Sequence, residues 1–133
     1  MRYFFGRSVV FLGVCLAGFL TAASASDSGS QSQVAAVVKM HFHSFDPKTV
    51  TINAGQTVRW ENKAFLVWHT VTADPALAKK AQDVALPPGA QPFNSGKIKS
   101  GGSYEHTFTV PGTYRYFCQP HESKGMVGEV VVK

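Results

Sequence analysis

Three side chains with affinity for soft metal ions lie close together near the C-terminal end of the 133-residue sequence. Cys118, His121 and Met126 have the spacing Cys-x2-His-x4-Met, in a short segment between two strand-like runs. A tight loop between fixed strand ends can direct all three side chains toward one centre. His69 lies upstream, at the start of another β-prone run. One thiolate, two imidazoles and a weak thioether are the donors of a blue-copper electron-transfer site.

Each of these residues, considered alone, permits another interpretation. Zinc uses the same cysteine and histidines but has little use for a thioether. Alone, Cys118 could be a buried inert thiol and Met126 a core residue. Their joint occurrence at this spacing, with His69 upstream, favours copper. His41 and His43 could bind a further metal from one strand face, but the sequence offers no third ligand beside them.

Short runs of alternating or β-branched residues, separated by turn residues, dominate the rest of the chain. Seven or eight short strands of this kind indicate an all-β sandwich or barrel. The long segment 73–92 is the exception, because Asp74-Pro75 is a good helix start and 76–83 (ALAKKAQD) is rich in helix formers. One short helix is therefore expected after His69. The predicted strands are 34–42, 50–52, 57–61, 68–72, 103–110, 113–118 and 127–132.

The N-terminal segment has the features of an export signal. Arg2 and Arg7 precede an apolar run at 8–20, and Ala23-Ser24-Ala25 follows as a small-residue cleavage signature. The run is shorter than the roughly 20 residues that span a bilayer, although an uncleaved anchor is the alternative. We therefore expect a signal peptide at 1–25, a flexible tail at 26–33 and a folded domain at 34–133, with no stable membrane span after cleavage.

Charge and cysteine content limit the possible functions. The formal net charge of the whole chain is +5, and cleavage after Ala25 would leave an excess of three basic residues. This excess is small and dispersed, which argues against a nucleic-acid partner. Cleavage also removes Cys15, so that Cys118 would be left without an intramolecular disulfide partner and needs another explanation.

These motifs resemble a known family. The stretch 112–121 (GTYRYFCQPH), followed by 125–128 (GMVG) and 130–132 (VVV), is similar to the C-terminal signature of plastocyanin-like cupredoxins. The segment 60–62 (WEN) before 69–71 (HTV) resembles their first copper-ligand region. The resemblance covers about 34–133, which identifies this part of the chain as a cupredoxin domain.

The resemblance implies a two-sheet Greek-key β-sandwich with one type 1 copper ion, Cu(I)/Cu(II). Its ligands would be His69, Cys118, His121 and Met126. We further expect the Thr70 amide to donate to the Cys118 sulfur. The family's activity would be the transfer of single electrons through the exposed edge of His121.

Other residues near the predicted site have expected roles. We expect Asn62 to fix the loop that carries His69 through side-chain hydrogen bonds. An apolar rim around the edge of His121 would suit brief docking of a redox partner. The residues of this rim would be Phe65, Leu66, Val67, Trp68, Pro120 and Met126.

The sequence thus predicts a monomeric, non-enzymatic electron carrier with transient protein donors and acceptors that dock near His121. It would be exported to a periplasm or a thylakoid lumen. Two alternatives are a copper-binding protein for periplasmic storage, delivery or resistance that uses the same ligands, and a metal-free interaction domain. Phe117 stands where plant plastocyanins have tyrosine, and the net positive charge replaces their acidic patch, which argues against docking to a basic partner.

Overall fold

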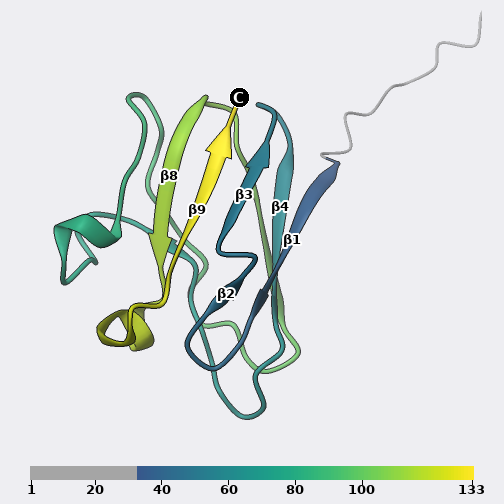
Figure 1. Cartoon of the computed structure of the whole chain (residues 1–133), viewed down its shortest axis with the longest axis vertical. Coiled ribbons are helices and arrows are strands. Elements are labelled where there is room, and N and C mark those ends of the chain that lie inside the picture. The colour runs from purple at the N-terminus through teal and green to yellow at the C-terminus, as the bar shows by residue number, and fades with distance from the viewer. Residues whose placement is uncertain (1–32) are drawn as a thin grey trace, which may run out of the picture.

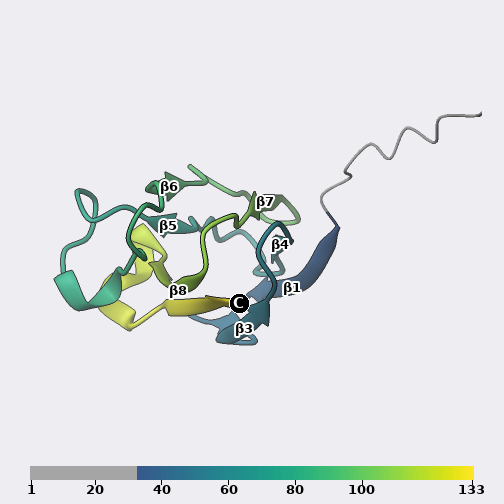
Figure 2. The same ribbon diagram turned by 90° about the horizontal axis from the view of Figure 1, so that it is seen from above.

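Two β-sheets pack face to face in the computed structural model, which describes residues 33–133 (Figures 1 and 2). The first sheet has the order β2-β1-β4-β7 and the second β3-β9-β8-β5-β6. The predicted signal peptide at 1–25 and all but the last residue of the predicted tail lie outside the described residues. The first sheet contains β1 (Val34–Met40), β2 (Phe45–Asp46), β4 (Thr57–Asn62) and β7 (Ser103–Thr107). The second contains β3 (Thr49–Ile52), β5 (Thr72–Ala73), β6 (Phe93–Asn94), β8 (Gly112–Phe117) and β9 (Val127–Val132).

The chain crosses between the sheets repeatedly, which gives the predicted all-β Greek-key sandwich. Strand β1 pairs in parallel with β4, and β3 pairs in parallel with β9, whereas the other strand pairs are antiparallel. Residues 33–133 contain nine strands rather than seven or eight. The additional strands β2 and β6 have two residues each, too few for a periodic pattern to reveal them.

The space between the sheets is filled by the inward-facing residues of the alternating runs. Val58 and Trp60 of β4 and Tyr116 of β8 are almost completely buried, as is Phe108 just after β7. The Trp60 ring meets the Tyr116 ring edge-on with centroids 5.3 Å apart, and the Phe108 ring lies 6.3 Å away. This aromatic core holds the two sheets together and supports the ends of β4 and β8.

The helix predicted over 76–83 is much shorter in the structure. Asp74 does cap a turn, because its Oδ1 accepts from the Ala76 N–H at 2.9 Å. The helix that follows is a single 3-10 turn, η1 (Ala81–Asp83). The N–H groups of Lys79 and Lys80 donate to a side-chain oxygen of Glu122 at 2.8 and 3.0 Å, instead of to carbonyls one helical turn earlier. A distant carboxylate therefore replaces the local hydrogen bonds that a continuous helix needs.

Three predicted strands also end differently. Residues 34–42 leave the sheet after Met40, because the His41 N–H bonds the carbonyl of Ser44 in a turn. The run 68–72 is reduced to an isolated bridge at His69 and the two-residue β5. The run 103–110 ends as a strand at Thr107. All of these changes except the last occur at the end of the sandwich where β4 finishes.

The loops at that end lie together in space. Strands β4 and β8 both finish toward the lower end of Figure 1, away from the marked C-terminus, and the Thr70 N–H donates to the Cys118 sulfur between the segments that follow them. They carry His69 and Cys118. Among the described residues, no helix is long and apolar enough to cross a membrane.

Candidate metal centre

His69 is fully buried and fixed through its backbone. Its N–H and C=O exchange hydrogen bonds of 3.1 and 2.8 Å with Ile98. The Asn62 amide donates to the carbonyls of Val67 at 2.7 Å and Ile98 at 3.0 Å, and its Oδ1 accepts from the Ala64 N–H at 2.9 Å. This confirms the expectation that Asn62 fixes the loop before His69.

Cys118 follows directly after β8 and is completely buried. Its N–H donates to the carbonyl of Met126 at 3.0 Å, which closes the loop between the two residues. Its sulfur accepts the Thr70 N–H at 3.4 Å, as expected from the sequence. The Thr70 hydroxyl also accepts from the Gln119 N–H at 2.9 Å. Thr70 therefore connects the His69 segment to the Cys118 segment through both backbone and side chain.

The segment between Cys118 and Met126 forms a 3-10 helix, η2 (Gln119–Lys124), which the sequence analysis did not predict. The His121 N–H donates to the Cys118 carbonyl at 3.0 Å, and the Met126 N–H donates to the His121 carbonyl at 3.3 Å. Gly125 ends the helix with φ of 74°, a left-handed conformation that suits glycine. The tight turn places His121 over Cys118 and turns Met126 back into the interior, where it is fully buried.

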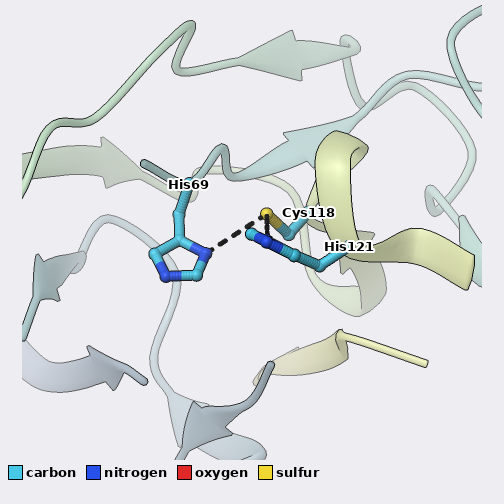
Figure 3. A group of neighbouring side chains, drawn as sticks. All are labelled: His69, Cys118 and His121. Atoms are coloured by element: carbon cyan, nitrogen blue, oxygen red, sulfur yellow. Dashed lines mark hydrogen bonds between the residues drawn. The ribbon is translucent and has the colours of Figure 1, made fainter. Parts of the chain in front are cut away.

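The three strongest candidate donors converge on one point. Nδ1 of His69 and Nδ1 of His121 each lie 3.4 Å from the Cys118 sulfur, and Figure 3 shows both rings turned toward it. All three ligand atoms lie within 4.8 Å of one another. Donors that share one ion at bond lengths of about 2.0–2.3 Å lie about 3.3–3.8 Å apart. The two sulfur–nitrogen distances thus fit donors that share a single metal ion.

The surroundings of the two imidazoles lower their pKa values, which favours the neutral form that binds a metal. Burial, with smaller effects from the nearby imidazoles of His121 and His43, lowers the pKa of His69 to about 4. Burial and the His43 imidazole also lower the pKa of His121. Burial raises the pKa of the Cys118 thiol, which the N–H groups of Thr70 and His121 partly oppose. Both imidazoles are therefore neutral near pH 7, whereas the thiol gives up its proton to a bound metal.

Two residues near the centre were not assigned to it from the sequence. The ring of His43 meets the ring of His121 with centroids 5.1 Å apart. Glu122, next to His121, is 1% exposed. Neither residue has a recognisable sequence signal. His43 reaches the site from the β1–β2 turn, and Glu122 contacts the 73–92 segment, only because the fold brings these distant segments together.

The structure tests the two remaining expectations about this end. Phe65, Leu66 and Pro120 of the predicted apolar rim are exposed, and Trp68 is 39% exposed, but Met126 is fully buried and does not belong to it. The inward turn of its loop explains the difference. Within 33–133, the cluster of three potential ligands consists of His69, Cys118 and His121 and does not include His41 or His43.

A Greek-key sandwich that gathers a cysteine and two histidines from the loops at one end defines the cupredoxin class. The family model for copper binding proteins of the plastocyanin/azurin family matches residues 32–133. The chain therefore belongs to the plastocyanin/azurin family of copper binding proteins.

Individual relatives agree with this assignment. The chain is 37% identical over 125 residues to a chloroplastic plastocyanin of Tetradesmus obliquus, covering 91% of this chain and 77% of the relative. It is 31% identical over 128 residues to plastocyanin of Prochlorothrix hollandica, covering 94% and 90%. Its fold is similar to that of a reduced amicyanin variant, with a TM-score of 0.57, 26% identity and coverage of 77% and 84%.

Membership in this family fixes the cofactor and the general activity. The protein is a blue copper protein with one type 1 copper ion as its cofactor, and it carries single electrons between redox partners. The donor set of the site fits that cofactor, because two neutral imidazoles and a thiol converge in a water-poor pocket.

Proposed function

We propose that His69, Cys118, His121 and Met126 are the copper ligands. The observation that carries this proposal is the convergence of two Nδ1 atoms on the Cys118 sulfur, each at 3.4 Å. Met126 supports it from the backbone, since its carbonyl accepts from Cys118 and its N–H donates to His121. A buried thioether that closes the same loop is in a suitable place to be the weak axial ligand.

Bound copper supplies a one-electron couple, Cu(I)/Cu(II), and the chain's own residues make the exchange fast. His69 and Cys118 are held by Ile98, Asn62 and Thr70, so the donors keep their positions whichever charge the site carries. Little rearrangement is then needed when an electron arrives or leaves.

His121 is the proposed route for the electron. His69 and Cys118 are fully buried, whereas His121 is only half-buried, and the exposed Phe65 and Leu66 lie in the loop that leads to His69. A redox partner that covers this apolar rim excludes water and brings its own centre near the His121 ring. No position for a chemical substrate is needed, which supports a role as a carrier rather than an enzyme.

The proposal also includes the export of the protein and the boundaries of its segments. Residues 1–25 act as a signal peptide, 26–33 as a flexible tail and 34–133 as the cupredoxin domain, which works as a monomer in a periplasm or thylakoid lumen. The basic start, apolar run and small-residue cleavage signature of the sequence support the export step. Transient donor and acceptor proteins dock near His121 in turn.

The ligand assignment is tested by the visible absorption spectrum of the protein after addition of Cu(II). The parent protein should develop an intense blue band that ascorbate bleaches, and Cys118→Ser should lack the band. His106→Gln, which changes an imidazole away from the site, should retain it. A parent protein that binds Cu(II) without the blue band, or a Cys118→Ser variant that keeps it, would contradict the assignment.

A further inference from the structure

A shallow groove with two lysines shares Leu66, Val67 and Trp68 with the predicted apolar rim. Its volume is about 310 Å³. We call it the basic groove, and its lining residues are Leu66, Val67, Trp68, Lys97, Lys99 and Ser100.

The basic groove is built on the same backbone that holds His69. Ile98 is buried and hydrogen-bonded to His69, so Lys97 and Lys99, one residue on either side of it, face outward. The Asn62 amide binds the Val67 carbonyl in one wall and the Ile98 carbonyl behind the other. One buried side chain therefore fixes both walls, which makes the groove a preformed surface.

The charge of the groove is uncompensated. Among residues 33–133, no Asp or Glu lines it, and neither Lys97 nor Lys99 forms an ion pair. The Lys97 ammonium lies 4.6 Å from the centre of the Trp68 ring, which stabilises its position without neutralising it. The groove thus combines two cations, one of them held against Trp68, with exposed apolar surface from Leu66 and Trp68.

We propose that the basic groove binds an acidic surface of a redox partner protein, with carboxylates at Lys97 and Lys99 and an apolar contact at Leu66 and Trp68. This inference rests on the proposed function and adds the charge of the partner to it. Charge complementarity selects the occupant, because the two lysines have no acidic neighbours of their own. The groove would orient the partner so that its redox centre faces His121, and it would speed the encounter at low ionic strength.

Stopped-flow kinetics with two haem proteins test this proposal. Ferrous cytochrome b5, which is acidic, would give one electron to the Cu(II) protein and become ferric, leaving Cu(I); cytochrome c, which is basic, serves as the contrasting probe. The variant Lys97→Glu/Lys99→Glu should lower the bimolecular rate constant with cytochrome b5 at least about tenfold at low ionic strength, because steering changes such rates by ~10–10³. The loss should vanish at high salt.

A matched control separates the groove from net charge alone. Lys39→Glu/Lys133→Glu makes the same change in net charge at exposed positions outside the groove and should change the rate much less. Equal losses in both variants, or no loss in the groove variant, would overturn the proposal. Lys97→Gln/Lys99→Gln should lower the rate constant by an intermediate factor. This variant shows whether the loss in the Glu variant comes from removal of the lysines rather than from the new carboxylates.

Two further readouts distinguish the other possibilities. In the protein without metal, cytochrome b5 should shift the indole N–H signal of Trp68 in the NMR spectrum, and unchanged signals would contradict docking. Binding to anionic lipid vesicles that depends on Lys97 and Lys99, with unaltered cytochrome b5 kinetics, would overturn the proposal in favour of a membrane surface. Failure of the proposed function itself would appear differently, as the absence of a blue, reducible copper site in the parent protein.

A separate observation concerns Glu122, whose carboxylate is buried between two distant segments. Its Oε1 accepts the N–H groups of Lys79 at 2.8 Å and Lys80 at 3.0 Å. Its backbone lies in the ligand loop, where its carbonyl accepts the Gly125 N–H at 2.9 Å. A buried carboxylate is costly unless it is hydrogen-bonded, and these hydrogen bonds offset part of that cost.

We infer that Glu122 is a positioning residue for His121, which fastens the ligand loop to the segment before η1. Glu122→Ala removes the acceptor for both N–H groups and frees the loop on that side. Glu122→Gln keeps an oxygen acceptor of the same length and should largely rescue the effect. Glu129→Ala, which removes a partly exposed carboxylate paired with Arg115, is the matched control.

Copper release and amide exchange test this second inference. Transfer of Cu(I) to a chelator should be about tenfold faster from Glu122→Ala than from the parent, with a shifted blue band, while Glu122→Gln and Glu129→Ala stay close to the parent. In the metal-free protein, the Lys79 and Lys80 amides should exchange with solvent faster in Glu122→Ala only. Unchanged copper release in Glu122→Ala, or an equal change in Glu129→Ala, would overturn the inference.

Discussion

His69 is fully buried and His106 is half-buried, and the two rings have different neighbours. Nδ1 of His69 faces the Cys118 sulfur at 3.4 Å, in a pocket made of loops. The ring of His106 stacks on Phe93 with centroids 4.0 Å apart and meets the Phe108 ring edge-on at 4.7 Å. Burial lowers the pKa of both imidazoles. Burial therefore supplies the neutral ring in either case, and the neighbouring atoms decide whether it binds metal or packs in a core.

The two regions also differ in how their backbones are held. The aromatic region around His106 is formed by strand faces, where alternation fixes each side chain. The metal end is formed by loops, and buried polar side chains such as Asn62 and Thr70 take over the role of strand pairing there. Changes to the first region should affect stability, and changes to the second should affect copper.

The largest expected effect separates the two kinds of imidazole. His121→Gly should lose the parent blue spectrum and open the site to external ligands, because His121 lies at the surface of the centre. Added imidazole should restore much of the band, as measured by titration in the visible range. The matched substitution His106→Gly should leave the spectrum intact, and an unchanged spectrum in His121→Gly would remove His121 from the site.

The aromatic region should dominate the folding free energy. Phe108→Ala should reduce the free energy of unfolding by about 3–5 kcal/mol, since it empties a fully buried ring position between the sheets. Urea unfolding of the metal-free protein measures this loss. Phe65→Ala, at a side chain that is 74% exposed, should change stability by no more than about 0.5 kcal/mol. Similar losses in both variants would show that the core is not where the structure places it.

Asn62→Ala should affect both properties at once, because Asn62 joins the first sheet to the loop of His69. Loss of its side chain removes the Asn62 donor from the Val67 carbonyl and leaves the Ile98 carbonyl with the His69 N–H alone, at a cost of about 1–3 kcal/mol. The reduction potential should also shift, as cyclic voltammetry can measure. Asn53→Ala, at an exposed turn, is the control. A variant with parental stability and potential would contradict the role assigned to Asn62.

The smallest expected effect is a pH dependence from the aromatic region. Because burial lowers the pKa of His106 in the folded protein, the unfolded chain takes up this proton first as the pH falls through about 6.5. Stability should therefore decrease from pH 7.5 to pH 5. His106→Gln should make that decrease smaller in the metal-free protein, measured as urea midpoints at both values. A parallel decrease in parent and variant would indicate that His106 titrates normally.

The sequence analysis found the residues of the site whose signal is local. Cys118, His121 and Met126 lie within nine residues, and the alternating runs predict most long strands correctly. The prediction of a helix at 76–83 was wrong over most of its length. The N–H groups of Lys79 and Lys80 donate to Glu122, which lies 43 and 42 residues away in the sequence. The contact of His43 with His121 depends on the turn after β1 in the same way. Partners that the fold brings together from distant segments leave no pattern in a single sequence.

The position of β9 in its sheet has a consequence for the order of events during synthesis. It lies between β3 and β8, pairing with both, although it is the last strand of the domain to be made. A nascent chain that has reached Met126 already has every proposed ligand but lacks the strand that joins the first part of the second sheet to the rest. The second sheet therefore cannot be completed before β9 is available, so the geometry that brings His69, Cys118 and His121 together belongs to the complete domain.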